Sequence, residues 1–306
     1  MSRRVAVLMG GWTAEREVSL VSGRECAKAL RELGYEVREI DVTCDLAALV
    51  KDLTPRPEVV FNALHGRGGE DGTVQGVLEF LRVPYTHSGV LASAVAMDKP
   101  IARSVFAAAG LPLAEGKVVS ASELAAGDVM ARPYVVKPVN EGSSVGVRIV
   151  QEGDKSWANE AKSWAFGERA LVEAYVPGRE ITVAVMGKRA LGALEIRPAK
   201  GFYDYDAKYA PGGSDHLVPA PIHATAYAQA LAIALAAHQA LGCRGVSRSD
   251  LRYDDTKGEP GRIVLLEVNT QPGMTPTSLV PDIARHAGIS FPALVQWMVE
   301  NAACDF

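Results

Sequence analysis

Residues 263–279 read IVLLEVNTQPGMTPTSL and combine an apolar run, a polar strand end and a tight turn. The first four residues are apolar, which is typical of a short buried strand. Because side chains alternate along a strand, Glu267 and Asn269 point to the same face. Their oxygens are ligands that Mg²⁺ prefers, and the Pro272-Gly273 turn exposes N–H groups suited to an anion. The stretch therefore predicts either a magnesium site beside an anion-binding turn or a strand with a solvated polar end.

Composition places the chain among ordinary soluble globular proteins. It has 306 residues, 48% of them hydrophobic and 22% charged, which is enough for two or three domains. With 32 basic against 36 acidic residues and no basic run, nucleic acid is not expected as a partner. The most apolar helical stretch, 228–241, is interrupted by polar residues and is shorter than the roughly 20 residues that span a bilayer. The N-terminal apolar run is too short for a signal peptide, so a cytoplasmic protein without membrane contact is expected.

The four cysteines are scattered, and the six histidines form no HExxH motif. Reduced thiols are therefore expected, with neither a zinc site nor a histidine metal site.

Strands alternate with helices in the first 95 residues, which predicts a parallel α/β sheet. The expected elements are a strand at 4–9, a helix at 14–33 and strands at 36–40 and 58–64. Ligands bind at the carboxyl ends of such strands, where Glu15 and the glycine-rich loop 63–72 lie. Neither that loop nor any other segment spells a dinucleotide fingerprint or a P-loop.

A hairpin flap is predicted at 134–150, where a glycine-rich loop joins two short strands. Residues 142–146 also match G-x-S-x-G, the nucleophile elbow of α/β-hydrolases, with Ser144, Asp250 and His286 in the right chain order. That motif requires a helix after the serine, whereas a strand, VRIV, follows here. The pattern therefore favours a flap over phosphates, while a flexible hairpin stays open as the simpler interpretation.

The second half carries further acids and bases. Strands are expected at 118–119, 170–175, 180–186 and 245–252, helices at 99–110, 156–167 and 225–241, and a long loop or lid at 200–217. Asp250 ends a strand near Glu267 and Asn269, the minimum set for one or two Mg²⁺ ions between nucleotide phosphates. Lys137 adjoins an apolar strand, so either a phosphate or a surface edge would explain it.

Seven segments together resemble the D-alanine–D-alanine ligase family of the ATP-grasp enzymes, in the family's order and over almost the whole chain. They are GGWTAEREVSLVSG (10–23), ALHGRGGEDGTVQG (63–76), MDK (97–99), VVKPVNEGSSVGV (135–147), GFYDYDAKY (201–209), SRSDL (247–251) and LLEVNTQPGMTPTSLVP (265–281).

The resemblance implies an α/β fold with a parallel-sheet N-terminal domain at 1–95, followed by an ATP-grasp fold of two α+β subdomains at 96–182 and 183–306. It implies ATP-dependent ligation of two D-alanines through an acyl phosphate, for peptidoglycan precursor synthesis. Mg²⁺, with Mn²⁺ able to substitute, and a homodimer formed through the first domain are also implied.

The resemblance also implies roles for single residues. The metal ligands would be Asp250, Glu267 and Asn269. ATP would contact Lys99, Lys137, Glu173, Val176, Glu180 and Asn269. The D-alanine sites would use Glu15, His65, Lys208, Tyr209, Arg248, Ser278 and Leu279, and the catalytic set would be Glu15, Ser143, Tyr209, Arg248 and Gly273.

The chain departs from the family pattern at Asn140, Ala174 and Ser249, and the first and last have no physical account. Tyr209 favours a dipeptide product, because relatives that form an ester lack tyrosine there. Besides the hydrolase, a carboxylate–amine ligase of other specificity and a non-catalytic nucleotide-binding regulator remain as alternatives.

Overall fold

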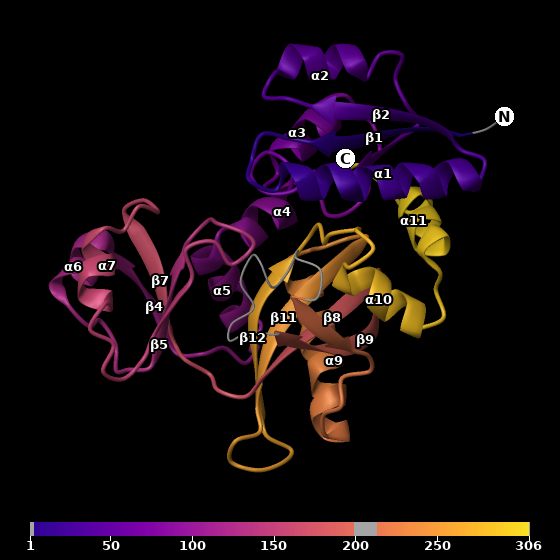
Figure 1. Cartoon of the computed structure of the whole chain (residues 1–306). Coiled ribbons are helices and arrows are strands. Elements are labelled where there is room, and N and C mark those ends of the chain that lie inside the picture. The colour runs from indigo at the N-terminus through magenta and orange to yellow at the C-terminus, as the bar shows by residue number, and fades with distance from the viewer. Residues whose placement is uncertain (1–2, 199–212, 306) are drawn as a thin grey trace.

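The computed structural model describes residues 3–198 and 213–305, which form three sheet-based parts (Figure 1). The first part holds a parallel sheet of order β2-β1-β3. Its elements are β1 (Arg4–Gly10), α1 (Arg16–Glu32), β2 (Glu36–Val42), α2 (Leu46–Asp52), β3 (Val59–Asn62) and α3 (Thr73–Phe80). The predicted parallel sheet is confirmed. Helix α2 was not expected; it begins where the Asp45 side chain accepts a hydrogen bond from the Ala48 N–H at 3.1 Å.

Two helices, α4 (Val90–Met97) and α5 (Lys99–Ala108), lead into the second part, an antiparallel sheet of order β4-β7-β5-β6. Its elements are β4 (Gly116–Ser120), α6 (Ala121–Ala126), β5 (Tyr134–Pro138), β6 (Arg148–Val150), α7 (Trp157–Lys162) and β7 (Arg169–Ala174). The antiparallel pairing of β5 with β6 confirms the predicted hairpin flap. Helix α7 is shorter than the expected 156–167, because the chain leaves the helix before Trp164, whose ring packs edge-on against Phe166.

The third part is an antiparallel sheet of order β10-β9-β8-β11-β12. Its elements are β8 (Arg179–Met186), β9 (Arg189–Pro198), β10 (Ser214–Leu217), α9 (Ala224–Ala240), β11 (Val246–Asp254), β12 (Arg262–Asn269), α10 (Leu279–His286) and α11 (Phe291–Glu300). The prediction of a loop at 200–217 was wrong over residues 214–217, because β10 pairs there with β9. Residues 199–212, with Lys208 and Tyr209, lie outside the described part of the chain.

The first and third parts share one hydrophobic core. Helix α11 returns to pack against α1 and β3, and Figure 1 shows it beside α1. The cluster joins Val7 and Leu30 of the first part to Ile283 and Leu294 of the last two helices, and all four are fully buried. A second core places α5 and α9 against the third sheet.

The expected domain borders at 95 and 182 lie inside α4 and β8. Because β7 belongs wholly to the second sheet and β8 wholly to the third, we propose the second border within 175–178 and keep the first near α4. Among residues 3–198 and 213–305, every helix is too short or too polar to cross a bilayer.

Candidate active site

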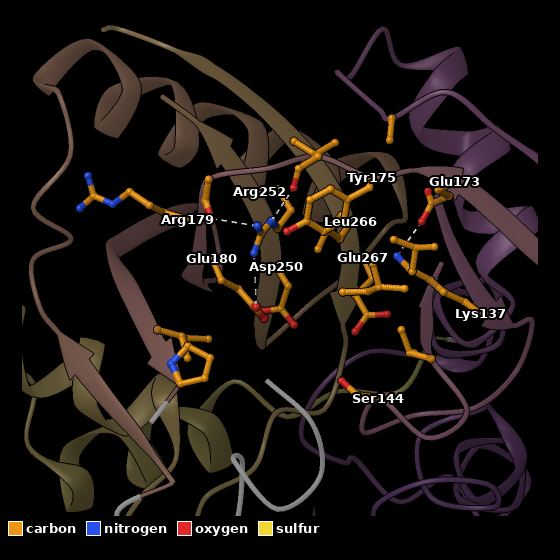
Figure 2. A pocket seen from close by; sticks show the side chains of 18 of the residues that line it. Lys137, Ser144, Glu173, Tyr175, Arg179, Glu180, Asp250, Arg252, Leu266 and Glu267 are labelled. Atoms are coloured by element: carbon orange, nitrogen blue, oxygen red, sulfur yellow. Dashed lines mark hydrogen bonds and ion pairs between the residues drawn. The ribbon is translucent and has the colours of Figure 1, made fainter. Parts of the chain in front are cut away.

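A cavity of about 640 Å³ lies between the second and third sheets. Figure 2 shows it from close by: the acidic side chains of β8, β11 and β12 reach into it, Lys137 faces them, and the flap residue Ser144 lies at its edge. Its charged lining includes Lys137, Glu173, Glu180, Asp250, Arg252 and Glu267.

The acids expected to hold a metal meet on two neighbouring strands. Asp250 of β11 is the register partner of Glu267 on β12, and Arg248 is that of Asn269. Asp250 accepts hydrogen bonds from the Arg248 guanidinium at 2.8 and 2.9 Å and from Thr182 Oγ1 at 2.7 Å. The three predicted ligands thus lie on two paired strands, and one guanidinium already neutralises part of the acidic charge.

Lys99 lies beside this acidic pair. It is the first residue of α5, a helix capped by the Asp98 side chain, which accepts from the Ile101 N–H at 3.0 Å. Its Nζ lies 3.6 Å from Glu267 Oε2 and donates to the Glu141 carbonyl oxygen at 2.6 Å. One lysine thus contacts both β12 and the base of the flap.

The partly buried Lys137 is held by an ion pair rather than lying at a surface edge. Its Nζ lies 2.6 Å from Glu173 Oε2, and Arg103 pairs with the other oxygen of the same carboxylate. The Glu173 side chain is only 3% exposed. Arg103 was not predicted from the sequence, although it follows Lys99 by one turn on the same helix and therefore lies on the same face.

The wall of the larger cavity away from Lys137 is held in place by Arg252, a second arginine that was not predicted from the sequence. Its guanidinium donates to the carbonyl oxygens of Val176 at 3.1 Å and Gly178 at 2.9 Å, and it lies 3.8 Å from Glu180 (Figure 2). This arginine therefore fixes the chain between β7 and β8, where the expected ATP contact Val176 lies. The only sequence signal for Arg252 was its place two residues after Asp250 on the same strand, which puts both side chains on one face of the sheet.

A smaller cavity of about 80 Å³ adjoins the first, and both are lined by Lys99, Glu141, Gly142 and Glu267. Its own lining includes Glu15, His65, Glu70, Ser143, Arg248 and Gly273. The structure thus brings four of the five residues of the expected catalytic set into one place, all except Tyr209, which lies outside the described residues.

The flap reaches across this cavity to the first part of the chain. Ser143 Oγ donates to Glu15 Oε1 at 2.5 Å. Both Ser143 and Ser144 have left-handed backbones, with φ of 50° and 59°, a strained conformation that such a contact helps to hold. Since the loop joins β5 to β6, the strand–turn–helix of a nucleophile elbow is not present at Ser144.

Two titratable groups with shifted pKa values line the smaller cavity, the buried His65 and the half-buried Glu70. Burial, together with the nearby Glu15, raises the pKa of Glu70 to about 8, and Glu70 Oε1 accepts from the Gly66 N–H at 3.0 Å. Burial, together with Arg248, lowers the pKa of His65 to about 4, so its ring is neutral at pH 7. No sequence pattern indicated a role for Glu70, which lies in the glycine-rich loop 63–72.

The chain after the Pro272-Gly273 turn packs closely against residue 273 and leaves room there only for glycine. Ser278 precedes α10 as its N-cap residue, and its Oγ accepts from the Thr275 N–H at 2.9 Å. A Cβ at Gly273 would lie 2.9 Å from that Oγ, so only glycine leaves the serine in place. Leu279 is the first, buried residue of α10.

Within the described residues, His, Cys, Asp and Glu side chains form no group of three or more placed to hold a metal ion. The expected set of two acids and one amide therefore stands alone as the candidate. All four cysteines are free thiols, as expected.

Comparisons with known proteins agree with this geometry. Two family models match the chain: the D-ala D-ala ligase N-terminus over residues 46–88 and the D-ala D-ala ligase C-terminus over 105–300. A curated D-alanine–D-alanine ligase of Granulibacter bethesdensis is 61% identical, over 99% of this chain and 98% of that protein. One of Paramagnetospirillum magneticum is 62% identical over the full length of both. The crystal structure of D-alanine–D-alanine ligase from Bacillus anthracis complexed with ATP has a TM-score of 0.81 and 32% identity, covering 98% of this chain and 97% of that one.

Proposed function

Because the chain belongs to the D-alanine–D-alanine ligase family, we propose that it joins two D-alanines to D-alanyl-D-alanine in the cytoplasm, for peptidoglycan precursors. The carboxylate of the first D-alanine takes the γ-phosphoryl group of ATP, releasing ADP, and the amine of the second then displaces phosphate from the acyl phosphate. The observation that carries this proposal is the junction of the two cavities at Lys99 and Glu267. A nucleotide in the larger cavity and an amino acid in the smaller one would meet there.

The larger cavity is assigned to ATP. Its volume of about 640 Å³ lies in the usual range for ligand sites. Lys99 and Lys137 would face the phosphates, with Val176 and Glu180 toward the base and ribose. Glu173 lines the same cavity, and its pairing with Lys137 supports a role in aiming that lysine as well as in contacting the nucleotide.

Asp250, Glu267 and Asn269 would hold Mg²⁺, for which Mn²⁺ could substitute. The donor set fits, because all three offer hard oxygens from adjacent strands. When bound, Mg²⁺ would offset charge on the β- and γ-phosphates. Since Arg248 and Lys99 lie beside the two carboxylates, we expect tight metal binding only together with the nucleotide.

The smaller cavity is assigned to the first D-alanine. Glu15 would hold its ammonium group, with the neutral His65 nearby. The Arg248 guanidinium and the Gly273 N–H would stabilise the oxyanion that forms when the second amine attacks, and such fixed donors are worth about 3 kcal/mol each. Arg248 is held for this task by two hydrogen bonds to Asp250.

The second D-alanine is assigned to the start of α10. Ser278 and the Leu279 N–H would bind its carboxylate, since a helix N-terminus favours an anion. The flap, through Ser143, would exclude water that hydrolyses the acyl phosphate. Lys208 and Tyr209 stay predicted D-alanine contacts on the ground of the resemblance.

We also infer a homodimer formed through the first domain. The exposed apolar side chains of Phe80 on α3 and Leu91 on α4 support this inference. Light scattering after size-exclusion chromatography would test it, and a single-chain mass at micromolar concentration would overturn it.

The experiment that tests the function measures ADP release with ATP and Mg²⁺ in the presence of no amino acid, D-alanine, L-alanine, or D-alanine plus D-lactate. We expect release that depends on D-alanine, with the dipeptide as product. Release with another acid or amine would identify a ligase of other specificity, and ATP binding without release would identify a regulator.

Two substitutions separate the ligase from the hydrolase. Glu267→Gln should abolish ATP turnover, because it removes a carboxylate from the proposed metal site. Ser144→Ala should leave ligation largely intact, because no covalent step uses this hydroxyl. ADP and dipeptide assays, with an ester substrate as a further check on Ser144, measure both. The reverse pattern would overturn the ligase assignment.

A further inference from the structure

Gln271 occupies a position that neither the motifs nor the proposed reaction explains. It lies two residues after Asn269 and two before Gly273, and it is 1% exposed. A buried amide without partners would be costly, so its hydrogen bonds define its role.

The side chain of Gln271 binds the first part of the chain. Its Oε1 accepts from Asn62 Nδ2 at 2.8 Å, and its Nε2 donates to the Leu64 carbonyl oxygen. Asn62 is the last residue of β3, is fully buried, and also donates to the Gly69 carbonyl oxygen at 3.0 Å. The amide pair thus reaches both ends of the loop that carries His65 and, next to Gly69, Glu70.

The backbone of Gln271 acts on both sites. It forms a hydrogen bond with the His65 side chain. Its N–H donates to Asn269 Oδ1 at 2.8 Å. A carbonyl oxygen has two lone pairs, so this bond orients the Asn269 amide and leaves a lone pair for a cation. Such outer hydrogen bonds commonly fix the direction of metal ligands.

We propose that Gln271 is a positioning residue that couples the proposed metal ligand Asn269 to the loop of the first D-alanine site. This proposal rests on the metal site proposed above. Its physical content is that one buried Gln271–Asn62 amide pair sets the alignment of two sites on different sheets.

The test compares Gln271→Met with Gln75→Met in the full-length protein. Gln75 is also a 1% exposed amide, and its Nε2 donates to the same Gly69 carbonyl oxygen at 2.8 Å, but from α3 within the first part of the chain. Three quantities are measured: Mn²⁺ affinity in the presence of ADP, by electron paramagnetic resonance; the KM for D-alanine against that for ATP; and the thermal midpoint.

Both variants are expected to lower the thermal midpoint, because each loses buried hydrogen bonds. Only Gln271→Met should weaken Mn²⁺ binding, by about tenfold or more, and raise the KM for D-alanine while leaving that for ATP within about twofold. Equal Mn²⁺ and D-alanine constants in the two variants would overturn the proposal. Wild-type protein that binds no Mn²⁺ with ADP would instead overturn the metal site itself.

A double-mutant cycle covers the case in which Gln271→Met folds poorly. Gln271→Glu keeps the oxygen that accepts from Asn62 but loses the donor to Leu64, so an intermediate loss of Mn²⁺ affinity is expected. Asn62→Ala breaks the other hydrogen bond of the pair, so it should weaken Mn²⁺ binding on its own, and the double variant should lose affinity by both steps, because the two substitutions remove different hydrogen bonds. Wild-type Mn²⁺ affinity in Asn62→Ala would overturn the coupling.

Discussion

At the scale of single residues, the smaller cavity holds two carboxyl groups close together. A Cβ at Gly142 would lie 3.6 Å from Glu15 Oε1 and 3.7 Å from Glu70 Oε1. Because the pKa of Glu70 is raised to about 8, this group remains protonated at pH 7 and the cavity avoids two adjacent negative charges. Of this pair, Glu15 then carries the negative charge that the proposed ammonium contact needs.

The raised pKa of Glu70 predicts a pH-dependent stability. The unfolded chain loses this proton near pH 4.5, whereas the folded protein keeps it up to about pH 8. The wild-type free energy of unfolding should therefore fall from this source as pH rises from 4.5 to 8. Glu70→Gln removes the titration but keeps an oxygen to accept from the Gly66 N–H, so it should gain at least about 1 kcal/mol relative to wild type between pH 5.5 and 8.5.

Urea denaturation at pH 5.5, 7.0 and 8.5 measures this difference. The exposed Glu32→Gln, at the end of α1, is the matched control and should follow the wild type at all three values. A constant offset between Glu70→Gln and wild type across the range would contradict the prediction.

Residues of the site differ in how far the sequence could predict them. The place of Asp250, Glu267 and Asn269 on neighbouring strands was predictable, because strand alternation and strand ends are local signals, while their metal binding stays a prediction. Arg103 and Gln271 were not predictable, because their roles come from partners 70 and 209 residues away. Tyr209 and Lys208 were named from the resemblance and stay predictions.

At the scale of elements, the flap shows the same contrast. The order of strand, glycine loop and strand predicted the β5–β6 hairpin, and its pairing confirms it. The sequence did not predict β9, which lies between β8 and β10 with α9 and α10 packed on its residues. A strand buried on both faces shows no alternation, so periodicity gives no signal for it.

The contact between the flap and Glu15 should determine how much of the proposed acyl phosphate is ligated to dipeptide and how much is lost to hydrolysis. Ser143→Ala removes a hydrogen bond to a charged group, worth roughly 1.5–3 kcal/mol. We expect the KM for D-alanine to rise by about tenfold, and the ratio of ADP to dipeptide to exceed one, because the flap closes less often over the acyl phosphate. Parallel assays of ADP and dipeptide measure the ratio.

Ser144→Ala is the control for this prediction, since it alters the adjacent residue of the same strained loop. It should keep a ratio near one. Equal ratios in the two variants would mean that the loop conformation matters and the Glu15 contact does not.

At the scale of the whole molecule, the parts are joined unequally. The first part shares a core with α10 and α11, while the larger cavity lies between the second and third sheets. The proposed amino-acid site therefore depends on the packing of α11 against the first part, whereas the proposed nucleotide site is formed without it. A substitution that weakens this core should therefore change the KM for D-alanine and the KM for ATP by different factors.

Leu294→Ala is the substitution that tests this dependence. Leu294 lies in α11 and is fully buried in the shared core, so its truncation should cost about 2–5 kcal/mol of unfolding free energy. Leu46→Ala in α2, where the side chain is 60% exposed, should cost less than about 0.5 kcal/mol. Denaturation followed by intrinsic fluorescence measures both values.

The same variant should raise the KM for D-alanine more than that for ATP, because Glu15 and His65 belong to the first part, while Lys137, Glu173 and Arg252 do not. It should also lower the unfolding temperature of the first and third parts together, since both parts contribute side chains to one hydrophobic cluster. Hydrogen exchange resolved along the chain would show this as equal loss of protection in β1 and α10. Loss confined to α11, with both KM values unchanged, would mean that the first part is held in place mainly by Gln271 and its partners rather than by the apolar core.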